Sequence, residues 1–208
     1  MLELSCLKYV DLLSSKAPVP GGGGAAAFVG SIGVALGSMV GNLTTGKEKY
    51  ADVEEDIQML LKKSEALIMR LNQLVQKDAA VFEPLAQAYK MPISTPEERA
   101  EKDSAIQEFL VQAARVPLAI AECSLEGIKL LDQYARKGSR LAISDAGVGV
   151  ILCKSAIQGS KLNVWINLKL LKDEEKRNEM KKKMLAIEAE GVKLADEVYQ
   201  YVEDQLCF

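Results

Sequence analysis

Histidine is absent from this 208-residue sequence, and cysteine and aromatic residues are sparse. Without histidine, acid–base chemistry at neutral pH falls to carboxylates, lysine, tyrosine or cysteine. The cysteines lie far apart and form no CxxC pair, so neither a metal site nor a cofactor is predicted. We expect small buried thiols in a reducing compartment at all four positions, Cys6, Cys123, Cys153 and Cys207.

A basic block is also missing. The net charge is −3 and both signs are interspersed along the chain, so nucleic-acid binding is not predicted. Glu3 and Asp11 interrupt any apolar N-terminal region, so a secretory signal is not predicted either, and the expected location is the cytoplasm.

Charged residues are lacking between positions 17 and 46. This run is long enough to span a bilayer, and Gly33, Gly37 and Gly41 have the small-xxx-small spacing of membrane helices. It opens, however, with two prolines and four glycines and has no tryptophan, tyrosine or arginine belt. A buried helix in close backbone contact with its neighbours is favoured over a membrane span.

Helical periodicity dominates, and no run alternates like a strand. From residue 50 to residue 88 the core positions recur at three- and four-residue intervals, which is typical of a long helix packed lengthwise in a bundle. Other helices are expected over residues 2–13, from the glycine tract to about residue 44, and after Asp173. The sequence predicts one all-α domain over residues 1–208, a helical bundle with long antiparallel helices.

Local signals place the remaining helix boundaries. Thr95-Pro96-Glu97-Glu98 is typical of a capping box, and Ser144-Asp145 of a helix start. Gly138 is expected to end the preceding helix. Pro84 is expected to bend the long helix, and Pro117 to kink or break the one after it.

Asp78 occupies a core position of the long helix where leucine would be expected. A buried carboxylate is costly unless it is paired or hydrogen-bonded, and burial raises its pKa into a range useful for proton transfer. Alternatively, Asp78 holds a buried lysine or arginine, or caps the bend at Pro84. The pattern alone does not separate a chemical role from a structural one.

Two other features are candidates for binding. The tract Gly21–Gly24 precedes a helix, whose first amides can bind an anion, although the glycines could simply permit a tight turn. Asn163 and Asn167 share one helical face and could bind the edge of a heterocycle or tie two helices together. Asp145 fits a plain capping role. The segment 41–47 matches GxxxxGK but lacks the preceding strand, so no P-loop is predicted.

These features recur in the order of one known family, along nearly the whole chain. They are Pro18-Val19-Pro20-Gly21-Gly22-Gly23, Gly46-Lys47-x-Lys49-Tyr50, Asp78, Thr95-Pro96-Glu97-Glu98, Val116-Pro117-Leu118, Ser144-Asp145 and Asn163-Val164-Trp165-Ile166-Asn167-Leu168. The chain thereby resembles the cyclodeaminase half of formimidoyltransferase-cyclodeaminase and the related methenyltetrahydrofolate cyclohydrolases. The resemblance implies a homodimer with its folate site near the subunit interface. It also implies cyclisation of 5-formiminotetrahydrofolate to 5,10-methenyltetrahydrofolate with loss of ammonia, or hydrolysis of the methenyl bridge.

The resemblance also assigns roles to residues. Asp78 and Asp145 become the acid–base or cation-stabilising carboxylates, and Lys47 a proton donor or a contact for the glutamate tail. Gly24 stands where the family usually has serine, and Ile93 where it usually has lysine. These departures favour the alternative of a non-catalytic folate-binding or helical scaffold relative. The expected substrate-binding residues are Gly21, Gly22, Gly23, Gly24, Asn42, Tyr50, Ser144, Asn163 and Asn167.

Overall fold

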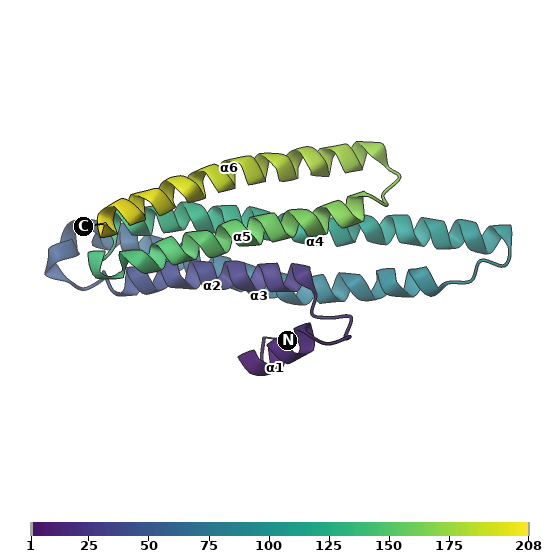
Figure 1. Cartoon of the computed structure of the whole chain (residues 1–208), viewed down its shortest axis with the longest axis horizontal. Coiled ribbons are helices and arrows are strands. Elements are labelled where there is room, and N and C mark those ends of the chain that lie inside the picture. The colour runs from purple at the N-terminus through teal and green to yellow at the C-terminus, as the bar shows by residue number, and fades with distance from the viewer. Residues whose placement is uncertain (1, 208) are drawn as a thin grey trace.

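The computed structural model describes residues 2–207, and no strand occurs among them. Helices α2 to α6 lie along one long axis, whereas α1 lies apart, beneath α2 (Figure 1). The predicted all-α helical bundle is confirmed. In chain order the elements are α1 (Cys6–Leu13), α2 (Gly22–Asn42), the 3-10 helix η1 (Glu48–Val53), α3 (Glu54–Lys90), α4 (Pro96–Lys137), η2 (Arg140–Ala142), α5 (Ile143–Leu168) and α6 (Glu174–Leu206).

The repeating core positions of α3 face inward, as predicted. One hydrophobic cluster draws its members from α2 through α6, so a single core runs along the bundle. Burial of such a stripe is the main stabilising contribution to a helix of this length. The buried positions of the stripe are Ile57, Leu60, Ser64, Leu67, Leu71, Leu74, Leu85 and Ala88.

Helices α2 and α5 cross backbone to backbone. A Cβ placed on Gly33 would lie 2.7 Å from the carbonyl oxygen of Gly149, and a Cβ on Gly149 would lie 2.7 Å from that of Gly33. Gly22, at the start of α2, lies beside Asn163, near the end of α5, so the two helices are antiparallel. The predicted close backbone packing of the second helix is confirmed.

By length and composition alone, α2 and the segment Arg140–Leu168 could each cross a membrane. Their most apolar windows are 56% and 50% buried within the bundle, as expected for core helices. The outward side of α2 nevertheless exposes Ile32, Met39 and Leu43 and carries no charge.

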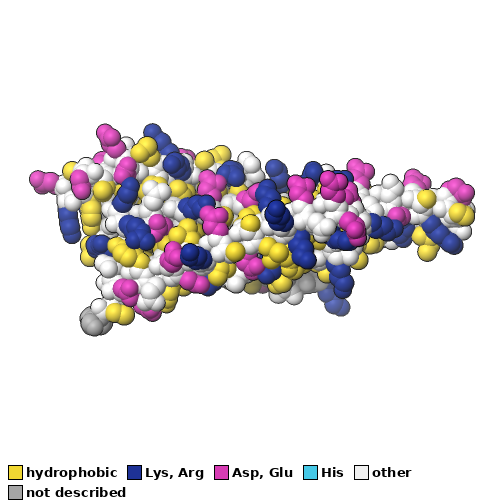
Figure 2. Space-filling model, turned by 90° about the horizontal axis from the view of Figure 1, so that it is seen from above, with side chains coloured by type: hydrophobic (Ala, Val, Ile, Leu, Met, Phe, Trp, Pro, Cys, Tyr) yellow, Lys and Arg dark blue, Asp and Glu magenta, His cyan; other side chains and the backbone are white. Residues whose placement is uncertain are grey.

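The face that α6 covers has a different character. Lysine, arginine, aspartate and glutamate are interspersed there (Figure 2). Ion pairs tie α6 to its neighbours, including Lys129–Glu190 at 2.6 Å and Lys161–Glu188 at 2.7 Å. The Lys129–Glu190 pair is exposed, and such pairs contribute only about 0–1 kcal/mol, whereas Lys161–Glu188 is partly buried.

Two predicted helix starts are displaced. Helix α1 begins at Cys6 rather than residue 2, because the Ser5 hydroxyl caps it by accepting from the amide of Lys8 at 3.2 Å. Helix α5 begins at Ile143, because η2 leads directly into it, so Ser144 and Asp145 fall in its first turn rather than at its cap. The capping box of Thr95 and the stop at Gly138 are confirmed.

Pro117 does not break its helix, which was one of the two predicted outcomes, because α4 continues through it to Lys137. Proline has no N–H to donate to the carbonyl four residues earlier, here that of Ala113. The side-chain amide of Asn167 donates to this carbonyl at 3.1 Å instead. A partner on α5 thus satisfies the acceptor that proline leaves free.

The cysteine prediction holds for half of the set. Cys123 and Cys153 are buried, and burial raises the pKa of the Cys153 thiol to about 12, which makes it inert. Cys6 and Cys207 are exposed, because they lie at the outer edge of α1 and just beyond α6.

Candidate active site

A cavity of about 320 Å³ opens where the start of α2, the second half of α3, the middle of α4 and the end of α5 meet. It contains most of the features that the sequence singled out for binding. Its polar lining consists of Gly21, Gly22, Gly23, Asp78, Asn163 and Asn167.

Asp78 stands at the start of α2. Its Oδ2 atom accepts a hydrogen bond of 2.7 Å from the amide of Gly24, in the first turn of that helix. Gly21, the N-cap residue of α2, has no side chain to cap the helix, so Asp78 supplies the missing acceptor from α3. The structural interpretation of Asp78 is therefore partly right, although what it caps is α2 rather than the bend at Pro84.

The electrostatics of Asp78 point to a second role. Burial raises the pKa of its carboxyl, and the Gly24 hydrogen bond offsets this only in part. Among the described residues that line the cavity, Asp78 is the only one with a charged side chain, and no ion pair to it is observed. A partly buried carboxylate without a counter-charge favours a cationic ligand.

Gly23 is required by the position of Asp78. A Cβ on Gly23 would lie 2.1 Å from Oδ1 of Asp78, so any side chain there would force the carboxylate to move. At Gly24 the same construction meets Oδ2 of Asp78 at 3.6 Å and the Val75 carbonyl at 3.7 Å, which are ordinary contacts. The carboxylate thus fits against α2 only because position 23 lacks a side chain.

We expect Gly23→Ala to displace the Asp78 carboxylate, and a reaction that uses this carboxylate for proton transfer should lose about a hundredfold in kcat/KM. Gly24→Ala, one residue away in the same tract, is the matched control and is expected to stay within about threefold of wild type. Steady-state kinetics on both variants, with circular dichroism to verify folding, measure the difference. Equal activity in the two variants would contradict the placement of Asp78.

Asn167 ties two helices together and also lines the cavity. Its amide nitrogen donates to the Ala113 carbonyl on α4 and, at 2.8 Å, to the carbonyl of Asn163. The amide nitrogen of Asn163 donates to Gly159 at 2.9 Å. Since both nitrogens are engaged with main-chain carbonyls, the side-chain oxygens are the groups left to accept from a ligand.

The rest of the cavity is apolar, and helical periodicity explains its composition. Phe82, Leu85 and Tyr89 follow Asp78 along one face of α3, and Ile166 and Leu170 follow Asn163 along α5 and into the loop after it. This wall was missed in the sequence, although the same face relation to Asp78 and Asn163 predicts it. The cavity therefore has a polar end and an apolar, aromatic end.

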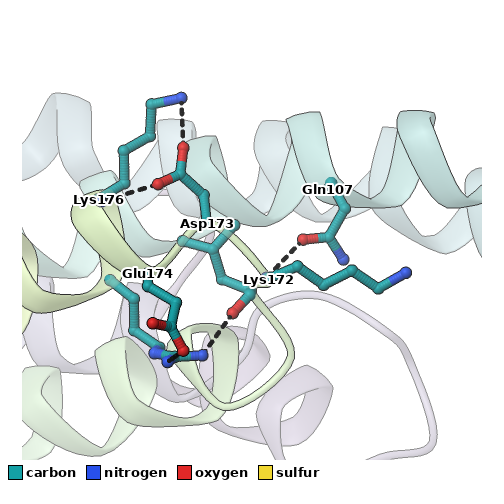
Figure 3. Close-up of polar contacts among 7 residues, drawn as sticks. Gln107, Lys172, Asp173, Glu174 and Lys176 are labelled. Atoms are coloured by element: carbon teal, nitrogen blue, oxygen red, sulfur yellow. Dashed lines mark hydrogen bonds and ion pairs between the residues drawn. The ribbon is translucent and has the colours of Figure 1, made fainter.

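The loop that carries Leu170 is fixed by hydrogen bonds from outside the cavity. Figure 3 shows Gln107 of α4 beside this loop, with Lys172, Asp173 and Lys176. Gln107 donates to the Leu170 carbonyl at 3.1 Å and accepts from the Lys172 amide at 2.7 Å. Asp173 caps α6 by accepting from the Lys176 amide at 3.0 Å. These bonds anchor the backbone of the loop that carries Leu170 to α4.

The remaining predicted residues lie at the other end of the bundle. Asn42 ends α2, which at 21 residues places it about 30 Å from the glycine tract. Lys47 precedes η1, which contains Tyr50. The Tyr50 hydroxyl accepts from the amide of Arg140 at 3.2 Å, just before α5. That hydrogen bond, with smaller contributions from nearby lysines, lowers the pKa of Tyr50.

Ser144 and Asp145 belong to this second group, since both lie in the first turn of α5. Within one chain the structure thus brings Asp78 together with the glycine tract and the two asparagines. It does not bring Asp145, Ser144, Lys47, Tyr50 or Asn42 to that cavity. We call Asn42, Lys47, Tyr50, Ser144 and Asp145 the far-end group.

A family model described as formiminotransferase-cyclodeaminase matches residues 5–186. The chain belongs to the formiminotransferase-cyclodeaminase family. Methenyltetrahydrofolate cyclohydrolase of Methylorubrum extorquens is 41% identical over 198 residues, which are 95% of each protein. A crystal structure of formiminotetrahydrofolate cyclodeaminase from Thermotoga maritima aligns over 100% of both chains with a TM-score of 0.89 and 30% identity.

Longer relatives match as well. Formimidoyltransferase-cyclodeaminase of Mus musculus is 34% identical over 174 residues, which cover 84% of this chain and 32% of that protein. The chain thus spans about a third of these longer relatives.

The two departures from the usual family pattern differ in their relation to the cavity. Gly24 lies beside Asp78, and the room around it would admit the usual serine, so space does not explain the glycine. Ile93 lies in the turn between α3 and α4, is 56% exposed, and is not among the residues that line the cavity. Of the two departures, only Gly24 bears directly on the carboxylate.

Proposed function

We propose that this chain hydrolyses the methenyl bridge of 5,10-methenyltetrahydrofolate in the cavity beside Asp78. The observation that carries the proposal is the partly buried, unpaired carboxylate of Asp78 at the start of α2. The methenyl bridge is a cation shared between N5 and N10, which is the charge that such a carboxylate favours. Similarity to a methenyltetrahydrofolate cyclohydrolase along 95% of both chains supports the same reaction.

The two ends of the cavity match the two parts of a folate. The pterin and its bridge belong at the polar end, where the side-chain oxygens of Asn163 and Asn167 can accept from ring N–H groups. The aminobenzoyl ring belongs against Phe82 and Tyr89 at the apolar end. The amide of Gly24 is already engaged by Asp78, so Gly22 and Gly23 offer the remaining free amides of the helix start.

In hydrolysis, water attacks the bridge carbon and the Asp78 carboxylate accepts a proton from that water. The C–N5 or C–N10 bond of the tetrahedral intermediate then breaks, the nitrogen keeps the electron pair, and a formyl group remains on the other nitrogen. One proton is released for each bridge hydrolysed. Burial raises the pKa of the Asp78 carboxyl, which makes it a better acceptor for that proton than an exposed aspartate, and it can then return the proton to the departing nitrogen.

The second candidate reaction is the cyclodeaminase reaction, and the match to the Thermotoga maritima cyclodeaminase over the whole chain favours it. There N10 attacks the formimino carbon on N5, and ammonia leaves after its nitrogen takes up a proton. Asp78 would then act in its protonated form as the donor, which its raised pKa also favours. The two reactions share one tetrahedral carbon and one carboxyl group.

We also propose a homodimer in which the far-end group of one copy completes the cavity of the other. The outward side of α2 is uncharged and exposes Ile32, Met39 and Leu43, which are 40%, 44% and 42% exposed. A two-fold contact through this side, with its axis across the long direction of the bundle, pairs each end of one copy with the opposite end of the other. Lys47 and Asp145 would then approach Asp78 from the partner.

The activity is tested by incubating the pure protein with 5,10-methenyltetrahydrofolate, and separately with 5-formiminotetrahydrofolate, while following the methenyl absorbance. Loss of absorbance with the first compound, faster than the buffer rate, supports the hydrolase. A gain with the second supports the cyclodeaminase. Tight binding without turnover would instead indicate a non-catalytic folate-binding protein, and neither binding nor turnover a helical scaffold.

A further inference from the structure

Tyr9 is the residue through which α1 attaches to the bundle. Its side chain is 6% exposed, and it is the only buried residue of α1, whereas Leu7 and Val10 of the same helix are 79% and 59% exposed. Within residues 2–207 its buried hydroxyl has no hydrogen-bond partner. An unsatisfied buried polar group is rare in native proteins and calls for an explanation.

The position of Tyr9 relates it to Asp78. Its ring packs against Phe28 of α2, with 5.4 Å between the ring centroids. Phe28 lies one helical turn beyond Gly24, whose amide binds Asp78, so Tyr9 and Asp78 lie against neighbouring turns of α2. Burial and the negative charge of Asp78 both raise the pKa of the Tyr9 phenol, which keeps it a neutral hydrogen-bond donor.

One carboxylate oxygen of Asp78 is free to accept a hydrogen bond. Its Oδ2 atom accepts from Gly24, and no hydrogen bond to its Oδ1 atom occurs in the described part of the chain. Oδ1 is also the atom nearest to Gly23, in the wall of the cavity. The other elements packed there offer Gly23 from α2, Ala113 and Pro117 from α4, and the two asparagines from α5, none of which titrates.

A link between the cavity and α1 is built into the chain. The segment that joins α1 to α2 contributes Pro18, Val19 and Gly21 to the cavity wall. A ligand in the cavity therefore touches the segment that follows α1, the helix that carries Tyr9. Tyr9 is the only buried residue of α1 and Leu12 is half-buried, so few side chains hold that helix against the bundle.

We propose that Tyr9 is a positioning residue whose hydroxyl donates a hydrogen bond to Oδ1 of Asp78 when substrate fills the cavity. This inference rests on the proposed function. The bond keeps the carboxylate ionised and oriented opposite the cationic bridge, which burial alone would disfavour.

One other buried hydroxyl, that of Ser160, also lacks a partner in the described chain, but it does not suggest a functional role. Ser160 lies in the core of α5. A serine hydroxyl in a helix can reach its own i−4 carbonyl by rotating about χ1, whereas the rigid phenol of Tyr9 cannot.

The test compares Tyr9→Phe with Tyr134→Phe. Tyr134 is also buried, but its hydroxyl bonds to the Ser64 hydroxyl at 3.1 Å and its ring does not line the cavity. For Tyr9→Phe we expect kcat to fall by about ten- to a hundredfold, with KM changed by less than about threefold. We expect the acidic limb of the pH–rate profile to move to higher pH by about one pH unit, because the ionised Asp78 carboxylate loses a hydrogen-bond donor.

Thermal stability should change in the opposite direction from activity. Tyr9→Phe removes an unsatisfied hydroxyl and should raise Tm by about 2–4 °C, whereas Tyr134→Phe should lower Tm and leave kcat and the pH profile unchanged. An unchanged kcat and acidic limb in Tyr9→Phe would overturn the proposal while leaving the proposed reaction intact. A wild-type protein that turns over neither folate would overturn both.

Discussion

Asp78→Asn is expected to lower kcat by about 10²- to 10⁴-fold, the range that general acid–base groups contribute. The amide oxygen of asparagine can still accept from the Gly24 amide, so the cap on α2 is retained. What is lost is the negative charge opposite the cationic bridge and the ability to take up a proton. Stopped-flow or steady-state absorbance of the methenyl group measures the change.

The same variant is expected to be slightly more stable than wild type at neutral pH. Burial raises the pKa of Asp78 above its ordinary 3.8, so the folded protein binds its proton more tightly than the unfolded chain does. Stability from this group is therefore lost as the pH rises from about 3.8 through the raised pKa. Asparagine has no such loss, so the Tm difference between variant and wild type should grow over that interval.

A surface carboxylate provides the control for both measurements. Asp196 is exposed and pairs with Lys154 at 2.5 Å, on the α5–α6 side of the bundle. Asp196→Asn should leave kcat unchanged and should not stabilise the protein. Full activity in Asp78→Asn would remove the basis of the proposed mechanism. A large loss of stability would show instead that the carboxylate is chiefly a structural cap.

The bundle was predictable because its determinants are local or periodic. The long stripe of α3, the capping box at Thr95 and the glycine stop at Gly138 each depend on residues within a few turns of one another. The continuity of α4 through Pro117 was not predictable in this way. It depends on Asn167, which lies 54 residues from the carbonyl it satisfies.

The cavity was predictable in part for the same reason. Asp78 interrupts an apolar stripe, and its anomaly is visible in the sequence. Its bond to Gly24 joins residues that are 54 positions apart in the sequence, and its close approach to Gly23 joins residues almost equally far apart. Sequence patterns do not reveal contacts at that separation. Tyr9 gave no signal at all, since one tyrosine in a short helix has no pattern that distinguishes it from an ordinary packing residue.

One chain alone does not bring the far-end group to the cavity, although the sequence predicted both as one site. Helices α2 and α5 are antiparallel, so the end of α2 lies beside the start of α5, about 30 Å from the cavity. A role for Asp145 in the chemistry at Asp78 then requires a second copy. The proposed dimer is therefore needed for the proposed chemistry and not only for assembly.

Mixing two inactive variants should therefore restore activity. If each cavity takes Asp78 from one copy and Asp145 from the other, a heterodimer of Asp78→Asn and Asp145→Asn holds one intact site and one doubly altered site. Random exchange of subunits makes about half of the dimers mixed, so about a quarter of wild-type activity should return. Each variant alone should be reduced by about a hundredfold or more.

Controls separate this result from simple refolding. Each variant exchanged with itself under the same conditions should stay inactive, and light scattering should show a dimer before and after exchange. Ile32→Asp places a charge on the uncharged outward side of α2, so it should yield monomers and abolish the recovery. If mixing restores no activity although subunit exchange is complete, Asp78 and Asp145 do not act together in one shared site. The far-end group would then serve the fold at its own end of the bundle, and Asp78 would be the only carboxylate in the reaction.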